Sequence, residues 1–368
     1  MSASKPRVAV AMSGGLDSSV AAALLQAEGL DVFGLTAITW SRGPNDCAEE
    51  DIRGAKRVAA SLGIAHHVLD LSEQFERDVV RGFADEYARG RTPSPCAVCN
   101  RTIKFGVLLD RALSLGADSM ATGHYVRTVS DSEGPVRLLR GIDRSKDQSY
   151  FLFELSQEQL RRARFPLGDR KKDDIRAWAA EVGLPTSSRG ESQDLCFVPP
   201  GEHWRVAEQY RPDARKRGAI TDRGGRVLGS HDGIHRFTVG QRRGLGVAVG
   251  KPVYVAEIRA ESNEVVVGPR EDLESPMLVA DGLHWISGSP PSSRFRTTVQ
   301  IRYNHAPAGA TVTLHAHDRA TVAFDEPQFA ITPGQVAAFY DGDELLGGGW
   351  IRAATTPSEP LERTAESG

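Results

Sequence analysis

A short segment near the N-terminus, Ser13-Gly14-Gly15-Leu16-Asp17-Ser18, has the composition of an anion-binding loop. Its two glycines let the backbone adopt positive φ and bring successive N–H groups close to a phosphate. The segment lies between a strand-like run and a helical pattern, so the N–H groups at the start of the helix would face the same anion. Asp17 could hold a magnesium ion that bridges phosphates. The alternative is that Asp17 and the serines only cap the helix.

Four cysteines are too few for a disulfide framework, so those that matter should act through reactivity or metal binding. Cys96 and Cys99 lie in a Pro-rich loop that we expect to precede a helix beginning near Ile103. A thiol near a helix N-terminus, with Arg101 and Lys104 close in sequence, is expected to favour the thiolate.

The role of these thiols stays open at this point. Cys196 lies in a polar loop after a predicted helix, and Cys47 is expected to be incidental. Cys99 and Cys196 could be catalytic. Cys96 and Cys99 could instead be half of a zinc site or a redox pair, although no second CxxC completes four zinc ligands and the context is not thioredoxin-like.

The elements that must position these residues alternate between strands and helices in the first 125 residues. The pattern predicts strands over 7–12, 31–39, 65–69 and 119–123, and helices over 18–28, 49–62, 72–89 and 103–115. This alternation is typical of βαβ units and a parallel sheet, with ligands at the carboxyl ends of the strands.

The pattern changes after residue 125. A hairpin is expected to turn at 131–134, and two short basic helices are expected over 157–164 and 171–182. Beyond about residue 205, short β-rich runs at 253–258, 264–267, 297–302, 310–314 and 335–340 predict small β domains or a barrel. A GxGxxxG string at 244–250 is read as turn glycines.

Composition excludes several classes of protein. The chain has 368 residues, 40% of them hydrophobic, and a net charge of −3, so it is expected to be globular, and its global charge does not argue for nucleic-acid binding. Locally the balance differs, with eight Lys or Arg against four Asp or Glu over 161–189 and ten against four over 205–243. No membrane segment or signal peptide is recognised, and we expect a cytoplasmic protein without a membrane partner.

The sequence resembles two known families, one nested in the other. The SGGxDS loop resembles that of the ATP pyrophosphatases (the PP-loop family), and an ordered set of segments resembles the tRNA-specific 2-thiouridylases within it. The set comprises the loop, Gly90–Phe105, Ala121–Tyr125, Lys146–Tyr150, Ser192–Phe197 and Phe237–Gly246.

The resemblance implies a fold and a reaction. The fold class would be α/β, with a PP-loop ATPase-type parallel-sheet domain over 1–202, a small mixed, β-rich linking domain over 203–270 and a C-terminal tRNA-contacting β-barrel over 271–353. The composition of residues 354–368, which are rich in Thr, Ser, Pro and Glu, predicts a disordered tail. The reaction would be ATP-dependent 2-thiolation of the wobble uridine of tRNA, with sulfur from a persulfide donor protein such as a cysteine desulfurase. The alternative is another ATP pyrophosphatase that amidates or thiolates a different acceptor.

The resemblance also implies site residues. Cys196 would carry the persulfide, and Cys99 would be the partner nucleophile that closes a transient disulfide with it. ATP would be bound by Ala11, Met12, Ser13, Gly14, Gly15, Leu16, Asp17, Ser18, Ala37 and Gly123. The target base and tRNA would be contacted by Ser94, Pro95, Cys96, His124, Lys146, Asp147, Gln148, Arg302, Tyr303 and Gln335.

The sequence departs from the family pattern in a few places. Cys96 stands where the family usually has Asp, Ala37 stands where Met is common, and Asn304 ends the usual Arg-Tyr-Arg run. The extra thiol suggests a further hypothesis. Cys96, Cys99 and Cys196 could together ligate an iron–sulfur cluster.

Overall fold

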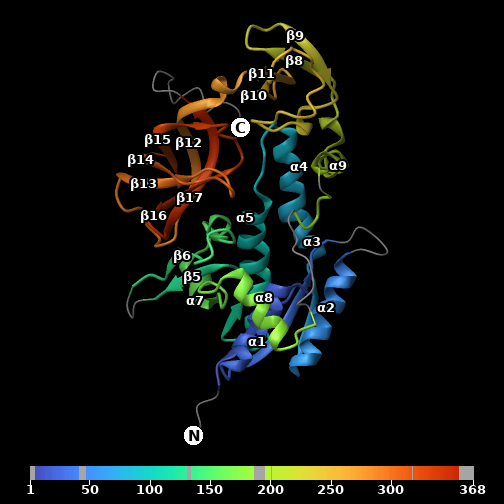
Figure 1. Cartoon of the computed structure of the whole chain (residues 1–368), viewed down its shortest axis with the longest axis vertical. Helices are drawn as coiled ribbons and strands as arrows, with labels where there is room; N and C mark the ends of the chain where they lie inside the picture. The colour runs from blue at the N-terminus through green and yellow to red at the C-terminus, as the bar shows by residue number, and fades with distance from the viewer. Residues whose placement is uncertain are drawn as a thin grey trace.

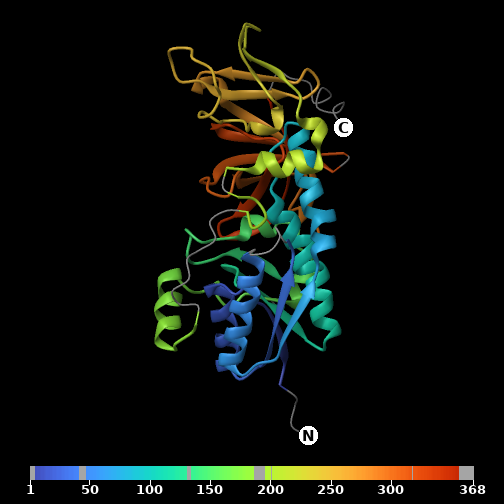
Figure 2. The same cartoon turned by 90° about the vertical axis from the view of Figure 1, so that its right-hand side faces the viewer.

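The computed structural model of the protein describes residues 5–40, 47–130, 134–185, 195–199, 201–316 and 318–355. The molecule is elongated, with an α/β part at the N-terminal end, a small β-sheet at the opposite end and a β-barrel between them (Figures 1 and 2). This arrangement confirms the predicted fold class. No helix in the described ranges is long and apolar enough to cross a membrane.

The α/β part is built on a five-stranded parallel sheet in the order β3-β2-β1-β4-β7. Its strands are β1 (Arg7–Ala11), β2 (Asp31–Ile38), β3 (His66–Asp70), β4 (Ser119–Ala121) and β7 (Ala163–Arg164). Strand β1 lies between β2 and β4. The chain leaves the carboxyl end of β1 toward β2 on one side, whereas it leaves that of β4 toward β7 on the other side. Open α/β sheets bind ligands at such a switch point.

Helices cover both faces of this sheet (Figure 1). The helices that contact its strands include α1 (Leu16–Ala27), α2 (Cys47–Leu62), α6 (Leu109–Ser114) and α7 (Gln157–Arg162). The other helices of this part of the chain are α3 (Ser72–Phe75), η1 (Glu76–Val80), α4 (Arg81–Ala88), α5 (Pro95–Cys99), η2 (Asn100–Leu108), η3 (Ser149–Leu152) and α8 (Lys172–Glu181), and α4 extends away from the sheet toward the far end of the molecule (Figure 1). The alanine-rich face of α1 packs against the sheet, and the helix ends before Gly29, whose φ of +83° suits glycine.

The helix that carries Cys96 and Cys99 begins earlier than the sequence indicated. A helix was expected from about Ile103 after a loop, but α5, η2 and α6 form a continuous helical run that starts at Pro95. Proline is compatible with the first helical turn because the N–H that it lacks would have no intrahelical partner there. Both thiols are therefore helical residues, and the loop prediction for them was wrong.

A four-stranded sheet, in the order β10-β11-β8-β9, forms the far end of the molecule. Its strands are β8 (Gly218–Asp222), β9 (Val227–His231), β10 (Tyr254–Arg259) and β11 (Glu264–Gly268), preceded by α9 (His203–Tyr210) and η4 (Pro212–Ala214) and accompanied by η5 (Ile234–Arg236) and η6 (Arg270–Leu273). Gly244, Gly246 and Gly250 have positive φ and lie outside helices and strands, as is typical of glycines in a connecting segment.

The barrel is antiparallel and closes through the pairing of β12 with β17. Its strands are β12 (Glu274–Trp285), β13 (Arg294–Gln300), β14 (Ala308–His315), β15 (Arg319–Phe329), β16 (Val336–Asp341) and β17 (Glu344–Thr355). The predicted hairpin exists as β5 (Val126–Val129) and β6 (Arg137–Arg140), although its turn residues 131–133 lie outside the described ranges. β6 pairs with β17, which joins the α/β part to the barrel.

Two expectations change in the β-rich part of the chain. The tail was expected to begin at residue 354, but Ala354 and Thr355 pair with β12 as the end of β17, and residues 356–368 lie outside the described ranges. Strands β8, β9, β12, β15 and β17 were not predicted. The proposed domain limits at 202/203 and 270/271 stay predictions.

Candidate active site

The loop at residues 11–18 lies at the switch point of the parallel sheet. It follows β1 directly, and the N–H of Met12 donates to the carbonyl of Leu35 on β2 at 2.7 Å. Gly14 has a φ of +72°, and Gly15 is the N-cap of α1 without a capping side chain. The alternative that Asp17 or a serine caps this helix is therefore wrong. N–H groups at the start of α1 remain available to an anion.

The glycine after β4 packs directly onto this loop. A Cβ on Gly123 would lie 2.9 Å from both the Cβ of Asp17 and the N of Ser18, a separation that real Cβ atoms do not show. Ala37, half-buried near the end of β2, lies at the same carboxyl edge of the sheet. The residues expected to bind ATP are thus brought to one edge by three neighbouring strands.

Asp17 has partners that the sequence did not predict. Both of its carboxylate oxygens accept from Nζ of Lys172 in α8, at 2.6 and 2.7 Å, and Oδ1 also accepts from the hydroxyl of Tyr125 at 2.7 Å. Lys172 is only 5% exposed, so it is not one of the solvated charges of a basic helix. No sequence signal separates this lysine from its exposed neighbour Lys171.

Two residues of the 143–149 loop form hydrogen bonds with the partners of Asp17. Asp143 accepts from the N–H of Lys172 at 2.9 Å, and the side chain of Gln148 accepts from the N–H of Tyr125 at 3.1 Å. The hydrogen bonds from Lys172 and Ser145 outweigh the effect of burial and lower the pKa of Asp143. A loop expected to contact tRNA therefore also holds the backbone of the two residues whose side chains bond to Asp17.

The described residues fit a nucleotide better than a resident metal ion. The open helix start, the positive φ at Gly14 and the buried Lys172 suit a phosphate group. Asp17 was expected to hold magnesium, but its carboxylate is already neutralised by Lys172. In the ranges that the structure describes, no group of three or more His, Cys, Asp or Glu side chains is arranged so that it could hold a metal ion, and this includes the three described thiols. The described residues therefore fit neither a resident magnesium site nor an iron–sulfur cluster.

The three thiols come together although Cys196 is distant in sequence. The sulfur of Cys196 is near enough to Cys96 and Cys99 to raise the pKa of both. The next residue, Phe197, holds Cys196 in this position. The buried ring of Phe197 packs edge-on against the rings of Phe75 and Phe83, with centroid distances of 5.5 and 5.1 Å. Cys196 itself is exposed, and the three thiols are not in disulfides. The side chain of Cys47 is not described.

The thiols are not poised as thiolates, contrary to the expectation. Burial raises the pKa of Cys99 to about 12 and that of Cys96 to about 11, and the ammonium of Lys104 opposes this only in part. The physical reason is that the helix starts at Pro95, so that Cys99 lies a turn inside it and faces the core. Access by a reactant to Cys196 is easier than to Cys99.

The barrel holds the segment that leads into these thiols. Nε2 of Gln335 donates to the carbonyls of Thr92 at 2.9 Å and Pro93 at 3.1 Å, and the N–H of Thr92 donates to the carbonyl of Pro333 at 2.9 Å. Ser94 and Pro95, which start α5, are buried. Gln335, expected to contact tRNA, therefore has a bracing role in the free protein.

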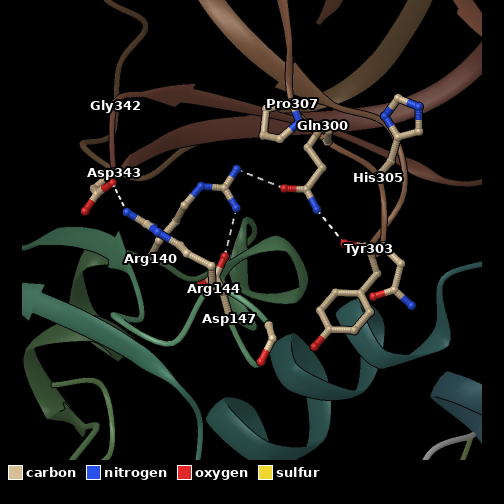
Figure 3. A pocket seen from close by; sticks show the side chains of 12 residues that line it. Arg140, Arg144, Asp147, Gln300, Tyr303, His305, Pro307, Gly342 and Asp343 are labelled. Carbon is tan, nitrogen blue, oxygen red and sulfur yellow. Dashed lines mark hydrogen bonds and ion pairs between the residues drawn. The ribbon is translucent and has the colours of Figure 1, made fainter. Parts of the chain in front are cut away.

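A pocket of about 460 Å³ lies between the 140–147 loop and the barrel (Figure 3). Arg140 crosses its floor, donating to Asp147 at 2.8 Å and to Gln300 at 2.9 Å, with its guanidinium over the ring of Tyr340. Nε2 of Gln300 donates to the carbonyl of Tyr303 at 2.6 Å. No cysteine or nucleotide-loop residue lines this pocket, so it is separate from the chemical site.

The residues expected to contact tRNA differ in their exposure. Asp147 is buried, and Ser149 and the N–H of Gly141 also donate to it. His124 is buried beside Phe105, and burial together with Lys104 holds the pKa of His124 well below its usual range. Lys146, Gln148, Arg302 and Tyr303 remain partly exposed. The tRNA contacts of all these residues stay predictions.

The basic stretch at 205–243 divides into paired and unpaired cations. Five arginines form ion pairs within the chain: Arg205, Arg211, Arg223, Arg226 and Arg236. The other five cations are exposed and form no ion pair with the described residues: Arg215, Lys216, Arg217, Arg242 and Arg243. The second group is free to neutralise an external anion.

Comparisons with known proteins cover nearly the whole chain. Three family profiles match in sequence order: tRNA methyl transferase HUP domain over 6–200, tRNA methyl transferase PRC-barrel domain over 206–269 and aminomethyltransferase beta-barrel domain over 275–351. A protein of Geobacter metallireducens called tRNA-specific 2-thiouridylase MnmA is 48% identical over 362 residues, 96% of this chain and 98% of its own. Proteins with the same name from Geotalea uraniireducens (47% identical, 95% of this chain, 96% of its own) and Carboxydothermus hydrogenoformans (48%, 94% and 98%) are similarly close.

Proposed function

The chain belongs to the MnmA family of tRNA-specific 2-thiouridylases, a family of tRNA sulfurtransferases that thiolate uridine, and from this premise we propose how it works. The proposed target is the 2-oxygen of the wobble uridine. ATP activates this oxygen as an adenylate, and a persulfide on Cys196 supplies the sulfur. AMP and pyrophosphate are the other products.

The observation that carries this proposal is the convergence of three thiols beside a phosphate-binding loop. Gly123 packs on the loop, and the next residue, His124, is in electrostatic contact with Lys104, which also contacts Cys96 and Cys99. The proposal places a nucleotide on the loop and a sulfur on Cys196 in one site. An amidating ATP pyrophosphatase would have no use for an exposed thiol paired with a half-buried one.

Adenylation would be the task of the loop and of Lys172. A pyrimidine carbonyl oxygen is a poor leaving group, so its attack on the α-phosphorus of ATP, with loss of pyrophosphate and of the N3 proton to solvent, makes AMP the group that later departs. The N–H groups at the start of α1 would hold phosphate oxygens. The buried ammonium of Lys172 can exchange the carboxylate of Asp17 for a phosphate oxygen.

Sulfur transfer would use the two thiols in turn. The terminal sulfur of the Cys196 persulfide, deprotonated by solvent, attacks C2 of the uridine and expels AMP. The thiolate of Cys99 then attacks the Sγ of Cys196, forming the Cys99–Cys196 disulfide and leaving the electron pair of the broken S–S bond on the sulfur attached to C2. N3 of the base takes a proton from water. A dithiol reductant and a persulfide donor protein, such as a cysteine desulfurase, restore the enzyme.

The tRNA would contact the barrel side and the far sheet. The uridine must leave the anticodon stack to reach the buried loop, as base-modifying enzymes generally require. Tyr303 lines the pocket between the 140–147 loop and the barrel, and Lys146, Gln148 and Arg302 are each adjacent in sequence to a residue that lines it. The unpaired cations of the 205–243 stretch would neutralise phosphates of the same tRNA.

The first experiment is nucleoside mass spectrometry of tRNA incubated with the protein, Mg-ATP and a persulfide donor. We expect 2-thiouridine at the wobble position with the wild type and none with Cys196→Ser. Methylated uridine in place of thiouridine would overturn the reaction. Thiolation that survives in Cys196→Ser would keep the reaction but overturn the persulfide assignment.

A second variant tests the nucleotide side. Lys172→Met removes the buried ammonium, and we expect ATP affinity, measured by calorimetry, to fall by about tenfold or more because a charge-assisted phosphate contact is lost. Lys171→Met is the matched control, since Lys171 is exposed. Equal ATP affinity in both variants would contradict the role of Lys172.

A further inference from the structure

Lys104 is a half-buried cation beside the thiols that the proposed chemistry does not use. In the ranges that the structure describes, its ammonium forms no ion pair and no hydrogen bond. Its electrostatic neighbours are Cys96, Cys99 and His124, and its charge favours the thiolate forms of the two cysteines. A half-buried lysine without a carboxylate partner is unusual, because burial of an unpaired charge is costly.

The backbone explains why Lys104 faces Cys99. In an α-helix, two residues five positions apart point about 140° away from each other. The segment η2, however, is a π-helix with i→i+5 hydrogen bonds, one of them from the N–H of Leu109 to the carbonyl of Lys104. This wider turn brings residue 104 one turn above residue 99 on the same face.

A side chain from another helix stabilises the wide turn. Nε2 of Gln159 in α7 donates to the carbonyl of Phe105 at 2.8 Å and to that of Arg101 at 3.4 Å. Gly106 accommodates the distortion, since a Cβ there would lie 3.0 Å from the Arg101 carbonyl. Insertion of a side chain into the helix ladder is a recognised cause of such distortions.

We propose that Lys104 is a positioning residue for sulfur transfer, placed by the π-helical turn so that its ammonium stabilises the thiolate of Cys99. The inference rests on the proposed function. The Cys99 proton is lost to water, the thiolate attacks Sγ of Cys196, and the pair of the broken S–S bond leaves on the sulfur bound to C2 of the uridine. Lys104 keeps its proton throughout. The groups facing Cys99 are Lys104, Cys96 and Cys196.

The test measures the thiolate directly. The rate at which iodoacetamide alkylates Cys99 in the full chain is followed by peptide mass spectrometry between pH 7 and 10, a range around the ordinary thiol pKa. With Lys104→Met, we expect this rate to fall by about tenfold at a given pH, because an opposite charge within a few ångströms shifts a pKa by about one unit or more. Lys104→Arg should restore the rate. Arg111→Met, which removes an exposed cation from the same helical run, should leave it unchanged.

Thiolation provides the second readout. The single-turnover rate of persulfide-loaded Lys104→Met should fall by about the same factor, with ATP and tRNA affinities unchanged. An unchanged alkylation profile in Lys104→Met, or in Lys104→Gln should the first variant not fold, would overturn the proposal. A wild type that fails to thiolate tRNA would instead overturn the proposed function, and the alkylation profile would still report on Lys104.

Discussion

Replacing Gln335 tests whether its side chain stabilises the folded protein or contacts tRNA directly. The side chain joins the barrel to the backbone that leads into the thiol helix, through hydrogen bonds to the carbonyls of Thr92 and Pro93. Each such bond contributes about 0.5–1.5 kcal/mol net, so the loss of both in Gln335→Leu should cost about 1–3 kcal/mol of the free energy of unfolding. The Thr92 N–H keeps its bond to Pro333, which favours the lower half of this range.

The assay compares urea unfolding, tRNA binding and the alkylation rate of Cys96 in the same variant. We expect Gln335→Leu to lower the free energy of unfolding and to speed alkylation, because the start of α5 loosens. Gln335→Glu should be worse, since a carboxylate would face two carbonyls. Gln209→Leu, an exposed glutamine on α9, is the control. Normal stability and alkylation combined with a loss of tRNA affinity would refute this reasoning and restore the direct contact.

Three further perturbations probe other parts of the structure. Gly123→Ala should weaken ATP binding by about 1–3 kcal/mol, as its Cβ would clash with Asp17, and calorimetry against the open-space substitution Gly82→Ala would detect it. Arg140→Met should cost about 3 kcal/mol of stability in urea unfolding because it leaves the Asp147 charge buried, and a cost below about 1 kcal/mol would contradict the importance of the pair. Burial raises the pKa of Cys99 to about 12, so the unfolded state loses this proton first as pH rises above about 9, and the free energy of unfolding should then fall. The fall should be smaller in Cys99→Ala, and equal pH slopes would show that the folded thiol titrates normally.

Much of the N-terminal fold could be predicted from the sequence because it depends on local patterns. The strand-like run at 7–12, the glycines of the loop and the helical spacing that follows are all set within about twenty residues, and β1, the loop and α1 appear where they were expected. The turn glycines at 244–250 also follow from local composition. Strands β12, β15 and β17 were missed because their pairing, and not their periodicity, defines them.

The predicted start of the helix that carries Cys96 and Cys99 was wrong because it, too, was read from the local pattern alone. Proline read as a loop residue, yet Pro95 begins a helix whose first turn needs no N–H from it. The start of the helix determines whether Cys99 lies at a positive helix end or inside the packed core. A chemical expectation about the thiolate therefore failed through a boundary error of a few residues.

The sequence by itself determined which chemical groups the chain carries: a loop of glycines and serines after the first strand, three thiols in ordered segments, and a parallel sheet to position them. Only the tertiary structure decided how these groups meet. Phe197, the neighbour of Cys196, packs against Phe75, the ion pair of Asp17 with Lys172 joins distant helices, and Gln159 of α7 donates to the carbonyl of Phe105, next to Lys104. Such contacts join residues far apart in the chain, and no local pattern encodes them because they form only when the whole core is packed.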